Sequence, residues 1–188
     1  MNFANKISTF RILTVPFFVA TLIYYRSPEK EFLRFLALGI FILGVISDAV
    51  DGYIARKSRE RSPAGLILDP LGDKLLLMSG FICLCLIKEF KLRFPLWVSL
   101  IVISRDTIIL LGAIVIFIVK QNINILPTRW GKLTTASQML AIISVLLQLS
   151  FAFIFWWLAV VFTLVSGIDY IRRGLNILYA PTNSGDSG

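Results

Sequence analysis

The chain has 188 residues, of which 57% are hydrophobic, and carries a formal net charge of +8 at pH 7. Its mean hydropathy of +0.81 is too high for a soluble domain with a polar shell, so we expect an integral membrane protein. The long apolar runs indicate that the excess Lys and Arg residues interact with anionic lipid headgroups and not with nucleic acid. The sequence contains no histidine, which excludes Ser-His catalysis and histidine-ligated zinc.

The apolar segments predict an all-α fold of about six transmembrane helices, because a spanning helix needs roughly 20 mostly apolar residues. We expect one integral domain over residues 1–177 and a disordered polar tail over 178–188. Cys83 and Cys85 lie in an apolar run without metal-type spacing and are predicted to be buried free thiols. The predicted helices are approximately residues 10–25, 33–55, 66–87, 94–119, 133–149 and 151–169.

The distribution of Lys and Arg among the predicted loops indicates the orientation of the chain. If the N-terminus lies in the cytoplasm, the loops on that side hold more basic residues than those on the other side. We therefore expect a bacterial-type cytoplasmic membrane protein with both termini inside.

Four aspartates lie near the cytoplasmic ends of the second and third predicted helices. Two are three residues apart and two are four apart, so each pair shares a helix face. Antiparallel neighbours would bring all four to one depth, where carboxylates repel each other unless cations lie among them. Oxygen ligands alone favour Mg²⁺ or Mn²⁺, in a two-metal site, with Ca²⁺ as the alternative. The four are Asp48, Asp51, Asp69 and Asp73.

A structural role is the alternative for these aspartates. Capping of helices, or pairing with the basic run 56–61, would explain one or two of them but not four. Asp48 follows the uncharged run 35–47, and Asp73 precedes the apolar stretch 75–87. Both therefore lie inside predicted spans, where an ionisable residue indicates function.

The spacing of these residues resembles the signature of the CDP-alcohol phosphotransferase family. The pattern is Asp48-x-x-Asp51-Gly52-x-x-Ala55-Arg56, then eight residues, then Gly65-x-x-x-Asp69-x-x-x-Asp73. A match at every fixed position is far more specific than a lone short motif. The resemblance covers most of the chain, since that family also has about six helices with its signature on the second and third. Phosphatidylglycerophosphate synthases are the most similar members.

The resemblance implies roles for the four aspartates. Asp48, Asp51 and Asp69 would be metal ligands. Asp73 would contact the second metal and act as the base that takes a proton from the acceptor hydroxyl. Like-charged neighbours raise the pKa of a carboxyl and bound cations oppose that effect, so the balance decides its strength as a base.

The same resemblance implies a CDP-binding set. Gly52 and Gly65 would allow the helices and the nucleotide to approach closely, and Arg56 would bind the pyrophosphate. Without the aspartates, the glycines would indicate helix packing in a membrane. Arg56 alone would be an ordinary residue of the positive-inside pattern.

Two charged residues interrupt the predicted fourth helix. Arg105 and Asp106 lie within an otherwise uncharged run, 94–119, where ions are costly. Helix neighbours point about 100° apart, so we expect the two side chains to face different partners. A structural ion pair with Lys74 is one interpretation of Asp106.

The acceptor phosphate is predicted to bind Arg105, Arg129 and Lys132, because a dianion beside a pyrophosphate requires local positive charge. Residues 131–138 resemble the Gly-Lys-x-x-Thr-x-x-Gln stretch of phosphatidylglycerophosphate synthases. Attraction to anionic lipid is the alternative for Arg129 and Lys132.

The resemblance implies transfer of the phosphatidyl group of CDP-diacylglycerol to glycerol 3-phosphate, in a polar cavity open to the cytoplasm. It also implies a homodimer. Ser104-Arg105-Asp106 departs from the usual Ser-Arg-Glu and looks more like cardiolipin synthases, which makes phosphatidylglycerol an alternative acceptor. Inositol phosphate is another alternative within the family. A cation transporter would explain the carboxylates but not the fixed glycine and arginine offsets.

Overall fold

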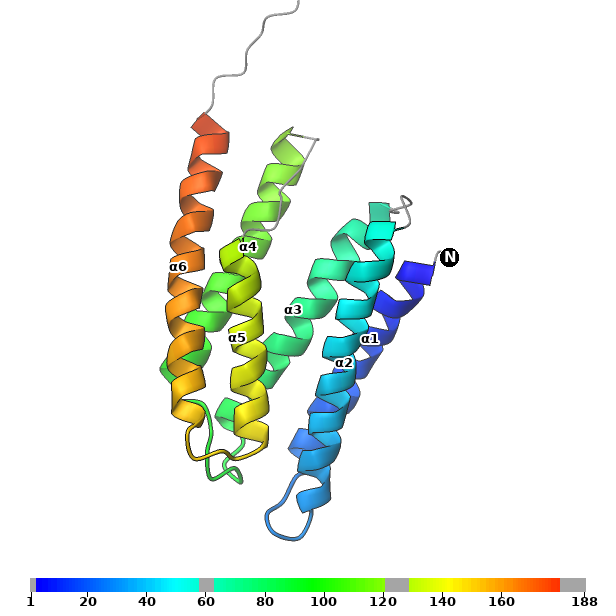
Figure 1. The fold of residues 1–188 in the computed structure, drawn as a ribbon, viewed down its shortest axis with the longest axis vertical. Coiled ribbons are helices and arrows are strands. Elements are labelled where there is room, and N and C mark those ends of the chain that lie inside the picture. The colour runs from blue at the N-terminus through cyan, green and yellow to red at the C-terminus, as the bar shows by residue number, and fades with distance from the viewer. Residues whose placement is uncertain (1–2, 58–62, 121–128, 180–188) are drawn as a thin grey trace, which may run out of the picture.

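The computed structural model describes residues 3–57, 63–120 and 129–179, with side chains described for 13–47, 72, 74–112 and 130–173. Within these residues the chain forms six α-helices and no strand, which confirms the predicted all-α class (Figure 1). The last helix continues two residues into the predicted tail, whose remainder, 180–188, lies outside the described residues. The helices are α1 (Phe3–Ile23), α2 (Glu31–Lys57), α3 (Pro63–Leu86), α4 (Leu96–Lys120), α5 (Arg129–Leu146) and α6 (Ala152–Tyr179).

The helix boundaries follow from local chemistry. Pro63 occupies the first position of α3, where a missing N–H costs nothing and the fixed φ suits a helix. The carbonyl of Pro95 accepts from the N–H groups of Val98 and Ser99 and so begins α4. The short connection 147–151 between α5 and α6 lies at the break predicted between residues 149 and 151, and Gln148 in it has a φ of 54°.

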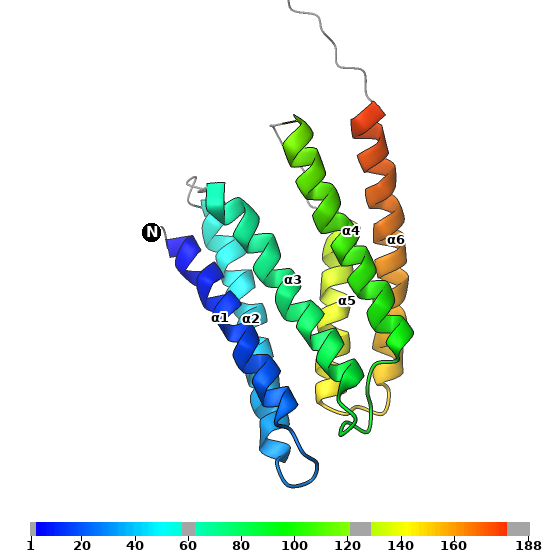
Figure 2. The same cartoon turned by 180° about the vertical axis from the view of Figure 1, so that it is seen from behind.

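The six helices run up and down in two groups joined by α3. Helix α1 packs against α2 and α3, whereas α6 packs against α5 and α4. Helix α3 contacts both groups, because it also packs against α4 and α5. Figures 1 and 2 show α3 crossing between the pair α1–α2 and the trio α4–α5–α6 from both sides.

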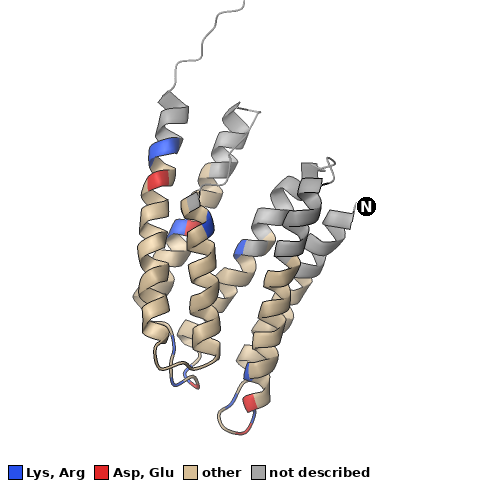
Figure 3. Ribbon diagram, viewed as in Figure 1, with Lys and Arg blue, Asp and Glu red and all other residues tan. Residues whose placement is uncertain are grey.

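The interior is apolar and aromatic along most of its length. Phe81 of α3 stacks on Phe94, with ring centroids 4.6 Å apart, and Phe94 meets Trp156 of α6 edge-on. Cys83 and Cys85 are free thiols, as predicted; Cys83 is buried as expected, whereas Cys85 is only half-buried. Figure 3 shows that most described charges lie in the loops and toward the helix ends, and that charged residues also occur inside α3 and α4, where Lys74 pairs with Asp106.

The outer surface is unusually apolar for a folded chain. Large side chains point outward from most helices; Phe17 is 68% exposed and Trp157 is 57% exposed. A contiguous apolar surface of this kind indicates contact with lipid or protein. In the part of the chain that the structure describes, one helical segment, Ala152–Arg173, is long and apolar enough to cross a bilayer by itself.

Candidate active site

The four aspartates lie on two helices that pack against each other. Asp48 and Asp51 belong to α2, and Asp69 and Asp73 belong to α3. At 1.5 Å rise per residue, Asp48 lies roughly 14 Å before the end of α2 and Asp73 roughly 15 Å after the start of α3. Because the short connection 58–62 joins those two ends, both pairs belong to the same end of the bundle.

The side chains of these aspartates lie outside the described residues, so their coordination geometry stays a prediction. Among the side chains that are described, no group of three carboxylates or thiols could hold a metal ion. Gly52 and Arg56 belong to α2 and Gly65 to α3, and the side chain of Arg56 also lies outside the described residues. The donor set is carboxylate only, which fits a hard divalent cation and not a thiolate-bound metal.

A buried ionic cluster adjoins the helix turn that carries Asp73. The side chain of Asp106 in α4 is fully buried, and its Oδ1 lies 2.9 Å from Nζ of Lys74, the residue that follows Asp73. The same Oδ1 lies 2.6 Å from Nη1 of Arg105. The ion pair considered for Asp106 is therefore confirmed, and it ties α3 to α4.

The expectation that Arg105 and Asp106 face different partners is wrong. Arg105 donates through Nη1 to Asp106 and through Nη2 to Ser166 Oγ of α6. The 100° angle between helix neighbours describes where side chains leave the backbone. An arginine is long enough to turn back, so its guanidinium reaches the adjacent carboxylate.

Among the described side chains, the cluster has two cations and one carboxylate. Lys74 and Arg105 share the single carboxylate of Asp106, and both cations are largely buried. Nε of Arg105 and Oδ2 of Asp106 are buried with no hydrogen-bond partner among the described residues. Two buried cations that share one carboxylate, one of them on the residue after Asp73, would favour a nearby anionic group.

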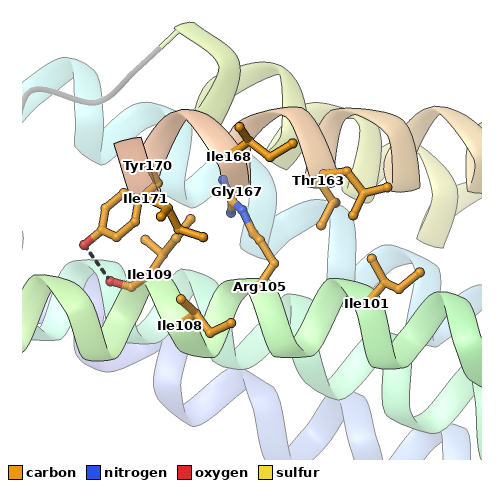
Figure 4. Close-up of a pocket in the computed structure, with 10 residues that line it drawn as sticks. Ile101, Arg105, Ile108, Ile109, Thr163, Gly167, Ile168, Tyr170 and Ile171 are labelled. Atoms are coloured by element: carbon orange, nitrogen blue, oxygen red, sulfur yellow. Dashed lines mark hydrogen bonds between the residues drawn. The ribbon is translucent and has the colours of Figure 1, made fainter. Parts of the chain in front are cut away.

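Arg105 also lines a cavity of about 170 Å³ between α4 and α6. Figure 4 shows its side chain extending from α4 toward α6 beside Gly167, among isoleucines of both helices. Tyr170 closes one end, because its hydroxyl donates to the carbonyl of Ile109 at 3.1 Å (Figure 4). The surroundings of Arg105 are therefore apolar on this side and ionic on the other.

The other predicted acceptor-side residues begin α5. Arg129 is the first residue of α5, with an undescribed side chain, and Lys132 is exposed without an ion pair among the described residues. No contact between Lys132 and Arg105 is found in the described structure. Gln138 is fully buried and donates to Thr163 Oγ1 at 3.3 Å, so it joins α5 to α6.

Sequence reasoning missed the polar face of α6. Three of its side chains form hydrogen bonds with other helices. Thr163 accepts from Gln138 of α5, Ser166 accepts from Arg105, and Tyr170 donates to the carbonyl of Ile109. Their spacings of three and four residues place them on one helix face. Polar residues at helical spacing within an apolar span indicate interhelical hydrogen bonds, and that signal could have found them.

Comparison with known proteins agrees with the signature on α2 and α3. Residues 1–165 match the CDP-alcohol phosphatidyltransferase family, and the chain belongs to that family. It is 31% identical over 180 residues to a probable phosphatidylglycerophosphate synthase of Mycobacterium tuberculosis, covering 93% of this chain and 82% of that protein. Two proteins named CDP-diacylglycerol--glycerol-3-phosphate 3-phosphatidyltransferase are also similar. The one from Bacillus subtilis is 31% identical, covering 94% of this chain and 97% of that protein. The one from Haemophilus influenzae is 30% identical, covering 91% of this chain and 92% of that protein.

Proposed function

We propose that this protein transfers the phosphatidyl group of CDP-diacylglycerol to glycerol 3-phosphate, which releases CMP and forms phosphatidylglycerophosphate. The observation that carries the proposal is the family signature distributed over two packed helices, with both aspartate pairs at one end of the bundle. The names of the relatives, which cover nearly the whole chain, support this donor and this acceptor.

The proposed reaction exchanges one phosphorus–oxygen bond for another. The hydroxyl oxygen of glycerol 3-phosphate attacks the lipid-side phosphorus, and the bond from that phosphorus to the bridging oxygen of CMP breaks. Asp73 accepts the hydroxyl proton, so proton and charge balance. General base catalysis of this kind contributes typically about 10²–10⁴-fold.

Asp48, Asp51, Asp69 and Asp73 would hold one or two divalent cations, Mg²⁺ or Mn²⁺. Such a cation supplies neutralisation of the pyrophosphate and of the charge that grows on the leaving CMP. Arg56 would bind the pyrophosphate as a bidentate donor, and Gly52 and Gly65 would leave room for the nucleotide. These assignments rest on the family signature.

Arg105, Arg129 and Lys132 would bind the phosphate of the acceptor. The cation surplus of the Lys74–Asp106–Arg105 cluster supports this assignment for Arg105. Its guanidinium is already oriented by Asp106 and Ser166, which would reduce the entropy lost on binding. An acceptor phosphate would then accept a hydrogen bond from Nε of Arg105, which has no partner among the described residues.

We infer that the bundle lies in a membrane with about six spans, cytoplasmic termini and a polar cavity open to the cytoplasm. The exposed apolar side chains on α1, α2, α4 and α6 support a lipid-facing surface. The acyl chains of the donor could then remain in the bilayer while its headgroup reaches the aspartates. A homodimer is part of the same proposal.

An acceptor panel tests the proposal. Purified protein in detergent receives CDP-diacylglycerol and Mg²⁺ with glycerol 3-phosphate, phosphatidylglycerol or inositol 1-phosphate, and released CMP is measured. We expect release with glycerol 3-phosphate and only background with the other two. Release with phosphatidylglycerol alone would instead make the protein a cardiolipin synthase.

A further inference from the structure

A cavity lined by polar side chains lies at the opposite end of the bundle from the aspartates. Three connections meet there: 24–30 between α1 and α2, 87–95 between α3 and α4, and 147–151 between α5 and α6. The cavity has a volume of about 350 Å³, which falls in the range of small-ligand sites. The six lining residues each carry a polar or charged group on an apolar stem or ring: Tyr25, Ser27, Glu31, Arg34, Lys91 and Gln148.

Contacts between connections that are distant in sequence hold the walls of this cavity. The ring of Tyr25 stacks on Phe90, with centroids 4.5 Å apart. Nη1 of Arg26 lies 3.0 Å from Oε1 of Glu89. Both contacts join the first connection to the second, so these walls are formed before any ligand arrives.

Gln148 joins the third connection, 147–151, to the second, 87–95, through side-chain hydrogen bonds. Its Oε1 accepts from the N–H of Leu92 and its Nε2 donates to the carbonyl of Leu92, each at 2.9 Å. Gln148 adopts a φ of 54°, a left-handed conformation that residues other than glycine rarely adopt. The two-point amide contact holds this lining residue against the second connection.

The charges in the cavity do not cancel. Glu31 is shared among three neighbours: its Oε1 accepts from the hydroxyls of Tyr25 and Ser27, and its Oε2 forms an ion pair with Nη2 of Arg34 at 3.0 Å but has no hydrogen-bond partner among the described residues. Nε of Arg34 is buried with no hydrogen-bond partner among the described residues. Lys91 lines the cavity and forms no ion pair within the described structure. Arg34 and Lys91 therefore line the same cavity with one carboxylate, Glu31, so one positive charge has no counter-ion among the described lining residues.

We propose that this cavity binds a phosphate group through Arg34 and Lys91. A guanidinium and an ammonium converging on one cavity are typical donors for phosphate oxygens. The site is separate from the proposed active site, because Glu31 and Asp48 lie roughly 25 Å apart along α2 at 1.5 Å per residue. It does not depend on the proposed function.

The surroundings of the cavity fit a phosphate carried by a lipid. Tyr24, Phe32 and Phe35 flank the lining residues and are all more than half exposed. The guanidinium of Arg34 lies over the ring of Phe35, 4.9 Å from its centroid. Aromatic side chains beside basic ones are typical of the headgroup level of a membrane, where a phospholipid would present its phosphate.

Thermal unfolding of the full chain in neutral detergent tests the proposal. EDTA is present throughout, so that binding at the aspartates does not contribute. The probes are dihexanoyl phosphatidylglycerol and inorganic phosphate, each titrated to saturation. The variant is Lys91→Gln, and Lys88→Gln, an exposed lysine of the same connection outside the cavity lining, is the matched control.

We expect a saturable rise in Tm with phosphatidylglycerol. Its apparent Kd should increase roughly fivefold in Lys91→Gln, because one charge-assisted contact that is partly exposed to solvent is lost. The Kd should stay unchanged in Lys88→Gln. The same dependence on Lys91 with inorganic phosphate would identify free phosphate as a second source of the ligand. If neither probe raises Tm, or if both variants respond alike, the cavity is not a phosphate site.

Discussion

Nζ of Lys74 lies 2.9 Å from Oδ1 of Asp106, and this contact joins the helix that carries Asp69 and Asp73 to the helix that carries Arg105. The carboxylate is fully buried and also receives Arg105. One acidic group therefore sets the spacing of α3 and α4 and the orientation of the guanidinium. Its loss should affect both stability and the acceptor side of the reaction.

Replacing Asp106 by asparagine should destabilise the protein by about 3–5 kcal/mol, because two buried cations lose their counter-ion. Thermal unfolding in detergent measures the loss. Asp169→Asn is the matched control, since Asp169 pairs with an exposed residue, Arg173, of the same helix, and such pairs contribute at most about 1 kcal/mol. Equal destabilisation by the two variants would show that the buried cluster stabilises the fold no more than an exposed ion pair does.

Arg105→Ala should raise the KM for glycerol 3-phosphate or lower its kcat/KM roughly tenfold or more, if one charge-assisted contact of about 1.5–3 kcal/mol is lost. The KM for CDP-diacylglycerol should change much less. Arg56→Ala should raise the KM for CDP-diacylglycerol more than the KM for glycerol 3-phosphate, because its proposed partner is the pyrophosphate. Equal loss of donor and acceptor affinity in Arg105→Ala would make that arginine a structural member of the ionic cluster.

Asp73→Asn should lower kcat by roughly a hundredfold or more while retaining CDP binding in the presence of Mg²⁺, because its proposed base role concerns the acceptor proton. Isothermal titration with CDP measures the binding, and CMP release measures the rate.

Asp69→Asn should lose both turnover and Mg²⁺-dependent CDP binding, because it removes a proposed metal ligand that no histidine or thiolate can replace. The same titration and CMP assay apply. Near-normal CMP release that still requires Mg²⁺ would remove Asp69 from the ligand set.

Gly112→Ala should destabilise the contact between α4 and α6 by about 1–3 kcal/mol. A β-carbon at this position would lie 2.9 Å from the hydroxyl oxygen of Tyr170 and 3.0 Å from a ring carbon, and the ring cannot move without losing its hydrogen bond to Ile109. Gly39→Ala is the control, because a β-carbon there meets nothing within 4 Å. That change should be neutral or stabilise by up to about 1 kcal/mol. Unfolding temperatures of both variants provide the comparison, and a loss in both would indicate a general effect of helix glycines.

The sequence alone predicted the number of helices and their order, because long uncharged runs leave few alternatives to a helix. It also predicted which helices carry the aspartates. Helix ends were less certain, since charged residues such as Lys57 and Lys120 continue a helix without adding to its apolar signal.

Side-chain partners were harder to predict than helices. The contact of Arg105 with Asp106 depends on how a long side chain turns back, which residue spacing does not encode. Ser166 by itself carries little signal in an apolar helix, and only its spacing from Thr163 and Tyr170 indicates an interhelical contact. The loop-end cavity arises from three connections that only the folded chain brings together.

The most direct test of the proposed function follows a labelled acceptor. Purified protein in detergent is given CDP-diacylglycerol, Mg²⁺ and radiolabelled glycerol 3-phosphate, and the label in the lipid fraction is compared with the CMP released. We predict one labelled lipid phosphate for each CMP, with both products absent in EDTA. Release of CMP without label in the lipid fraction would contradict transfer to glycerol 3-phosphate.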